Sequence, residues 1–80
     1  MSWGAVQNAL TPEQVTAVVE AASKELSSLS LGELRNRAEV GRRADAAVRN
    51  GLRALGGPQP DNNQLQGMIN RVVARVGGLG

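Results

Sequence analysis

Several residue types that carry chemistry in proteins are missing from this chain. It has no cysteine, histidine, tyrosine or phenylalanine, and its nine basic residues are eight arginines and one lysine. Without cysteine the chain can form no disulfide and no thiolate metal site. Without histidine, a transition-metal site would need carboxylates alone, and the serines have no imidazole to activate them. We therefore expect no catalytic residue, no cofactor and no metal ion, and a protein that is not an enzyme.

Long apolar runs and a basic leader are missing as well. The first ten residues hold no basic side chain, whereas a secretory signal begins with a positive segment followed by an apolar one. A membrane-spanning helix needs about 20 apolar residues in succession, and no segment comes near that length. The expected location is therefore the cytoplasm or the inside of a particle. Arginine in place of lysine, with much alanine, valine and glycine, favours GC-rich coding and a bacterial or phage source.

The chain is short for a stable core. Its 80 residues predict a single helical domain over 1–80, with a flexible or short helical arm at 1–10 and a flexible tail at 77–80. A domain of this size buries a modest fraction of its surface. Small domains gain further stability from disulfides, metals, oligomerisation or regular helix packing. Since the first two are excluded, we expect the chain to self-associate or to dock in a larger assembly.

A helix start signal, the capping box, occurs three times. In this pattern a Ser, Thr or Asp is followed three residues later by Glu or Gln. The boxes begin at Thr11, Ser30 and Asp61. Apolar residues at helical spacing follow each box, and glycines followed by prolines at 56–60 end the middle helix. The sequence therefore predicts helices near 12–28, 31–55 and 62–76 and no strand. This is an all-α fold, either a small three-helix bundle or a helical hairpin with a third helix.

Small residues form one face of the predicted middle helix. Such residues let two helix axes approach closely. The face consists of Val40, Gly41, Ala44, Ala47, Val48 and Gly51. We expect it to pack inside a tight three-helix bundle, with reception of a partner helix as the alternative.

The opposite face of the middle helix carries a stripe of arginines. At 100° per residue, four guanidinium groups fall within about 40° of one another. The arginine stripe consists of Arg35, Arg42, Arg49 and Arg53. A guanidinium offers a planar fork of donors that suits phosphate, so the stripe is the candidate contact for a polyanion such as nucleic acid.

Acidic residues near the arginine stripe favour a second interpretation, an exposed face of local ion pairs. Such pairs stabilise a helix by about 0.2–0.5 kcal/mol each. In a continuous helix the expected pairs join Glu33 to Arg37, Glu39 to Arg35 and Arg43, and Asp45 to Arg42 and Arg49. We expect this second interpretation to hold, because the same acids would repel a nucleic-acid backbone.

The third predicted helix and the N-terminus supply two more candidate contacts. An apolar stripe on the third helix is the candidate self-association surface, with packing inside the bundle as the alternative. It consists of Leu65, Met68, Ile69, Val72 and Val76. Arg71 and Arg75 beside this stripe are also typical of a helix that lies on a membrane surface. Trp3 is the candidate anchor for a partner, since tryptophan is enriched at interaction hot spots; the alternative is a cap on the bundle.

These patterns support one leading hypothesis and two alternatives. The leading hypothesis is a non-enzymatic structural or interaction protein that self-associates or docks in a larger assembly, such as a bacterial or phage particle. The first alternative is a nucleic-acid-binding protein that uses the arginine stripe. The second is a helical peptide that binds a membrane surface. The partner of the chain is accordingly expected to be a second copy or a larger protein assembly, before nucleic acid or membrane.

Overall fold

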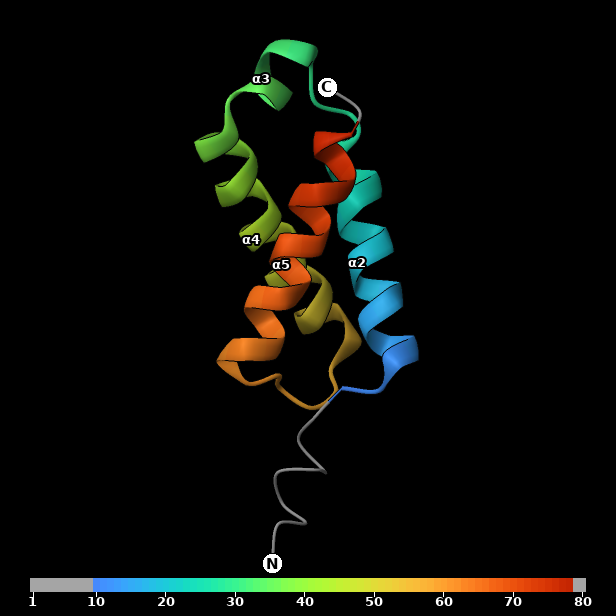
Figure 1. Ribbon diagram of the computed structural model, residues 1–80. Coiled ribbons are helices and arrows are strands. Elements are labelled where there is room, and N and C mark those ends of the chain that lie inside the picture. Colours follow the sequence, from blue (N-terminus) through green and yellow to red (C-terminus); the bar gives the residue numbers. More distant parts are fainter. Residues whose placement is uncertain (1–9, 79–80) are drawn as a thin grey trace, which may run out of the picture.

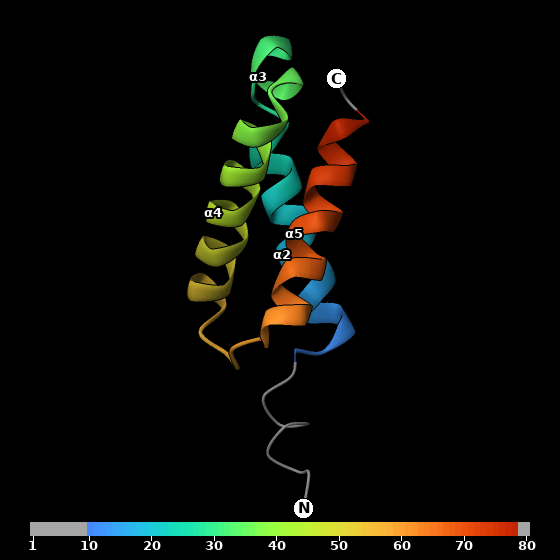
Figure 2. The ribbon, with the colours of Figure 1, turned by 60° about the vertical axis from the view of Figure 1, so that its left-hand side comes forward.

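Four helices follow one another along residues 10–78, the part of the chain that the computed structural model describes (Figure 1). They are α2 (Pro12–Leu26), α3 (Leu31–Arg35), α4 (Arg37–Leu55) and α5 (Asn62–Gly77). The long helices α2 and α5 run in the same direction, and α4 runs antiparallel to both (Figures 1 and 2). The short α3 lies at the end of the bundle where the chain passes from α2 to α4. Over the described residues no strand occurs, and the predicted all-α bundle is confirmed.

The first two predicted capping boxes are both formed. At the start of α2, the amide of Gln14 donates to Thr11 Oγ1 over 3.1 Å, and the amide of Thr11 donates to Gln14 Oε1 over 2.9 Å. At the start of α3, the same two bonds join Ser30 and Glu33, over 3.2 and 3.0 Å. Each box satisfies two backbone donors that a helix start would otherwise leave without a partner. Helix α2 ends at Leu26, slightly before the predicted boundary, with Ser27 as its C-cap.

The third predicted box is only half formed. The amide of Gln64 donates to Asp61 Oδ1 over 2.7 Å, as expected. The side chain of Gln64, however, does not return to the backbone of Asp61. Instead Gln64 Oε1 accepts from the Leu10 amide over 3.3 Å, and its Nε2 donates to the Leu10 carbonyl over 3.5 Å. One side chain therefore joins the start of α5 to the segment that leads into α2.

The predicted continuous helix over 31–55 is wrong, because the chain bends at Asn36. The backbone of Asn36 is extended, with φ −82° and ψ 94°, and this residue ends α3 and begins α4. Its side chain accepts a hydrogen bond from the amide of Glu39 over 3.2 Å. Asparagine is among the residues that most favour an N-cap position. The chain therefore contains a fourth start signal, Asn36 followed three residues later by Glu39.

The C-terminal end of α4 requires glycine. Gly56 has φ +68°, a left-handed conformation that side chains other than glycine seldom adopt. Its amide donates to the carbonyl of Leu52 over 3.2 Å, which satisfies one of the last carbonyls of the helix. Beyond it the chain turns through Pro58 and Pro60 and enters α5.

A single core of small aliphatic side chains holds the helices together. Its largest fully buried side chains come from all three long helices: Val19, Val48, Met68, Val72 and Val76. Gly51 of α4 lies against Val18 of α2, and a Cβ atom placed at Gly51 would stand only 3.2 Å from Val18 Cγ1. This close approach, together with buried Ala22, Ala44 and Ala47, lets the bundle pack without aromatic residues. The face of small residues predicted on α4 thus packs inside the bundle except at Gly41, which borders the outer side of the helix.

The ends of the described chain differ slightly from the predicted boundaries. Leu10, predicted to close a flexible arm, is buried in the core with 6% of its surface exposed. Helix α5 extends through Gly77, and Gly78 is its C-cap. The predicted N-terminal turn falls on residues 1–9, outside the described residues, as do residues 79–80.

Candidate functional site

The arginine stripe is divided by the bend at Asn36. Arg42, Arg49 and Arg53 lie on the exposed face of α4, whereas Arg35 belongs to α3. Arg35 and Arg37 border a hollow of about 250 Å³ between α3, α4 and α5. Arg49 and Arg53 border a different hollow of about 320 Å³, where the end of α4 meets Pro60 and Asn62. The bend therefore separates Arg35 from the other three members of the stripe.

Local partners neutralise part of the stripe. The Arg42 guanidinium pairs with Glu39, and Arg49 pairs with Asp45. Arg53 donates to the neutral Oδ1 of Asn50 over 3.1 Å. The side chains of Arg42 and Arg49 are nevertheless 69% and 56% exposed, so both guanidinium groups keep donors directed at solvent. The predicted pair between Glu39 and Arg43 is also present, with Arg43 Nε 2.9 Å from Glu39 Oε2.

Three of the predicted ion pairs are not formed. They are Glu33 with Arg37, Glu39 with Arg35, and Asp45 with Arg42. The first two needed a continuous helix through residue 36, and the bend removes the spacing of one helical turn on which they depended. Asp45 contacts Arg49 instead of Arg42, and Arg42 turns to Glu39.

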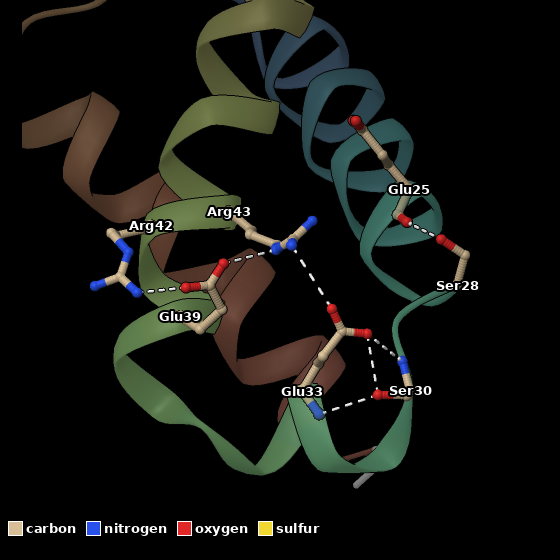
Figure 3. A network of polar contacts seen from close by, with 7 residues as sticks. All are labelled: Glu25, Ser28, Ser30, Glu33, Glu39, Arg42 and Arg43. Carbon is tan, nitrogen blue, oxygen red and sulfur yellow. Dashed lines mark hydrogen bonds and ion pairs between the residues drawn. The ribbon is translucent and has the colours of Figure 1, made fainter.

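Arg43 joins the two sides of the bend (Figure 3). Its guanidinium contacts Glu39 on α4 and also lies 3.6 Å from Glu33 Oε2 on α3. A continuous helix would hold positions 33 and 43 about 15 Å apart along its axis, so the sequence pattern could not indicate this pair. Arg43 therefore acts as a clamp between α3 and α4.

Both carboxylates of this network are held in the charged form. Hydrogen bonds from the backbone and the hydroxyl of Ser30, followed by the charge of Arg43, lower the pKa of Glu33 below its ordinary value of 4.5. Hydrogen bonds from Arg42 and then Arg43 lower the pKa of Glu39 below the same value. Hydrogen bonds to the ionised form of a carboxyl group favour that form. The ion pairs of Arg43 with Glu33 and Glu39 shown in Figure 3 thus join two charged carboxylates across the bend.

Charge is distributed unevenly over the helices. Helix α2 carries three glutamates and one lysine, a net charge of −2, whereas α3 and α4 carry six arginines and three acids, a net charge of +3. Five arginines form no ion pair within residues 10–78: Arg35, Arg37, Arg53, Arg71 and Arg75. The same is true of the three glutamates on α2, which are Glu13, Glu20 and Glu25. Apart from the unpaired Lys24 on α2, the unpaired positive charges therefore lie on α3, α4 and α5, and the unpaired glutamates lie on α2.

Two broad, shallow depressions lie on these charged faces. The first follows the outer side of α4, and its lining includes Gly41, Ala46 and the stripe arginines Arg42, Arg49 and Arg53. The second follows the outer side of α2 and is lined by Pro12, Glu13, Thr16, Ala17 and Glu20. Both are open surfaces. Neither encloses a small molecule.

The candidate self-association stripe on α5 lies inside the chain's own core. Met68, Ile69, Val72 and Val76 are each at most 6% exposed, and Leu65 packs against the same core. The stripe packs in the bundle, which was the alternative interpretation, because α2 and α4 already cover it. The folded bundle therefore offers this stripe neither to a second copy nor to a membrane. Trp3, the candidate anchor, lies outside the described residues.

Chemical sites and related proteins give no further indication of function. In the described part of the chain, no group of three His, Cys, Asp or Glu side chains is placed to hold a metal ion. Among the helices in that part, none has both the length and the apolar character needed to cross a membrane. Comparisons with protein-family models, with curated proteins and with solved structures gave no match.

Proposed function

We propose that this chain is a non-enzymatic structural or interaction protein, a small helical subunit that self-associates or docks in a larger assembly. The observation that carries the proposal is the excess of unpaired charge of opposite sign on different helices: Glu13 and Glu20 on the outer side of α2, and arginines on α3, α4 and α5. Complementary charged surfaces steer association and set its register. The apolar core, by contrast, is buried within one chain. We therefore expect a partner to bind the charged outer faces.

Nucleic-acid binding is the second candidate. Arg53 has only a neutral partner, and it borders the same hollow as Arg49 at the end of α4. Arginine side chains that line one hollow can contact successive phosphates, since each guanidinium presents several donors in a plane. Against this candidate, Glu39 and Asp45 pair with two of the stripe arginines and place negative charge on the same helix.

Light scattering at low and high salt, with and without duplex DNA, separates the two candidates. The single chain has a mass of 8.4 kDa. The proposal expects the scattering mass to rise with protein concentration in the absence of DNA. The second candidate expects a single-chain mass alone and a complex with DNA that weakens steeply with salt, because phosphate contacts release counterions. A single-chain mass throughout, with no DNA complex, would contradict self-association and nucleic-acid binding together.

A further inference from the structure

Two exposed helix faces carry opposite charge and similar spacing. The acidic face on α2 is defined by Glu13, Thr16, Ala17 and Glu20, and the basic face on α4 by Arg42, Ala46, Arg49 and Arg53. All eight residues are exposed. Glu13 and Glu20 are seven residues apart, as are Arg42 and Arg49. Seven residues make about two helical turns, or roughly 10.5 Å, so charges of opposite sign recur at the same interval on the two faces.

Small residues between the charges allow the two faces to approach each other. Ala17 lies between Glu13 and Glu20, and Ala46 lies between Arg42 and Arg49. Helices pack at separations that depend on the side chains at the contact, and small side chains permit the closest approach. Long arginine side chains at the edges can then reach glutamates across the contact, while the alanines meet at its centre.

We propose that the acidic face of one copy of this chain docks on the basic face of a second copy. This inference rests on the self-association proposed above and names its surfaces. Since the two faces differ, the contact is heterologous: each copy keeps one face of each kind for further copies, and the product is a ring or an open chain of subunits. Charge complementarity identifies a second copy of the chain as the partner. The glutamates on α2 form no ion pair within residues 10–78, and Arg53 has only Asn50 as a partner.

The spacing of the two faces favours a parallel arrangement of the two helices. Glu13, Ala17 and Glu20 are separated by four and three residues, as are Arg42, Ala46 and Arg49. A parallel register therefore places Glu13 opposite Arg42, Ala17 opposite Ala46 and Glu20 opposite Arg49. An antiparallel register that places Glu13 opposite Arg53 leaves Glu20 opposite Ala46. Lys24 lies at the level of an arginine in either register, Arg53 in the first and Arg42 in the second, so the match of the glutamates and alanines decides between them.

The existing pairs of Arg42 and Arg49 do not prevent this contact. Each guanidinium has five N–H donors, and the exposed side of each group can bind a second carboxylate while Glu39 and Asp45 keep the first. Exposed ion pairs stabilise only weakly one by one. We therefore expect weak association that strengthens at low salt, because salt screens exposed charges over about 8 Å at physiological ionic strength.

A charge-swap experiment tests the contact directly. The E13R/E20R variant makes the acidic face basic, and the R42E/R49E variant makes the matching positions of the basic face acidic. Each variant alone should associate at least about tenfold more weakly than the wild-type chain, because each then pairs like charges at every contact. An equimolar mixture should recover association, since the reversed faces complement each other and the unchanged faces also match.

The matched control is R71E/R75E, which applies the same charge change to exposed arginines on α5 outside both faces. It should associate as the wild type does, and circular dichroism should show that every variant keeps its helices. Three results would overturn these surfaces: association that survives in either swap variant alone, no recovery of association in the mixture, or an equal loss of association in the control. If association survives in a swap variant alone, the proposed self-association stands, with another interface. If the wild type itself stays a single chain at all concentrations, self-association is also refuted.

Engineered cysteines test the register, because the natural chain has none. Mixed A17C and A46C variants should form disulfide-linked pairs of the two chains under mild oxidation. Either variant alone should stay largely unlinked, since the proposed contact never brings two copies of position 17, or two copies of position 46, together. Efficient linking of A46C alone would indicate a symmetric contact between two α4 helices and would contradict the proposal.

Discussion

At the scale of single residues, two side chains contact residues that are more distant in the sequence than their local pattern indicated. Arg43 contacts Glu33 across the bend, and Gln64 binds the backbone of Leu10. Local spacing identified the helix starts correctly at Thr11 and Ser30. It could not show where a long side chain would find its second partner, because that depends on which segments the fold brings together.

Replacement of Gln64 by alanine should destabilise the bundle. The change removes both hydrogen bonds to Leu10, whose amide and carbonyl are partly buried. A hydrogen bond typically contributes about 0.5–1.5 kcal/mol, and unsatisfied buried groups cost more, so we expect a loss of about 1–3 kcal/mol in urea denaturation. Gln66→Ala is the control, because Gln66 is exposed and bonds only to Asn70 within its own helix. Equal losses of unfolding free energy in the two variants would show that the contact to Leu10 contributes no more stability than an exposed hydrogen bond.

The Glu33 carboxyl should titrate below its ordinary pKa, and Ser30 should be the main cause. We expect NMR titration to place the pKa of Glu33 below 4.5 in the wild-type chain and closer to 4.5 in S30A, with a smaller rise in R43Q. Since the pKa is lowered in the folded state, the carboxylate contributes stability above pH 4.5, and this contribution is lost as the pH falls through the lowered pKa. A larger rise in R43Q than in S30A would contradict this order of causes.

At the scale of helices, the sequence predicted three starts and missed the fourth. A Ser, Thr or Asp before an apolar run identifies a start because its side chain binds an amide that the helix leaves unpaired. Asn36 does the same for Glu39, but it lies among charged residues that suit the exposed side of a continuous helix equally well. The bend is also held by Arg43, a contact that exists only once α3 and α4 have diverged. A local pattern therefore could not decide between the two conformations.

Two glycines should respond in opposite ways to replacement by alanine. A Cβ at Gly67, within α5, meets no atom within 4 Å, so Gly67→Ala should stabilise the protein by about 0.5–1 kcal/mol by reducing the freedom of the unfolded chain. Gly56→Ala should destabilise it by about 1–2 kcal/mol, because Gly56 has φ +68°. Melting temperatures of the two variants measure both effects. Equal shifts of the same sign would contradict the assignment of Gly56 as the left-handed cap.

At the scale of the whole molecule, apolar periodicity predicted which residues are buried but not what covers them. The α5 stripe was correctly expected to avoid water, and the same pattern would serve an interface or an intramolecular core. Helices α2 and α4, which are comparable in length to α5, cover the stripe within one chain. For the arginine stripe, the sequence correctly placed every member except Arg35 on the exposed face of α4. It did not predict all of their ion-pair partners, because these depend on a bend that no local signal decided. The core was thus more predictable than the surface.

Val72→Asp distinguishes a core within one chain from a core shared between chains. Val72 is fully buried in the single chain, so an aspartate there would carry an uncompensated charge into the core, one of the most destabilising changes known for a small domain. We expect the variant to be unfolded by circular dichroism even at the highest protein concentrations. Ala74→Asp, two residues further along the same helix and on its exposed side, should remain folded. If Val72 instead packed between two copies of the chain, V72D would yield a folded single chain that no longer associates. Helical circular dichroism together with an 8.4 kDa mass for V72D would therefore contradict the core described above.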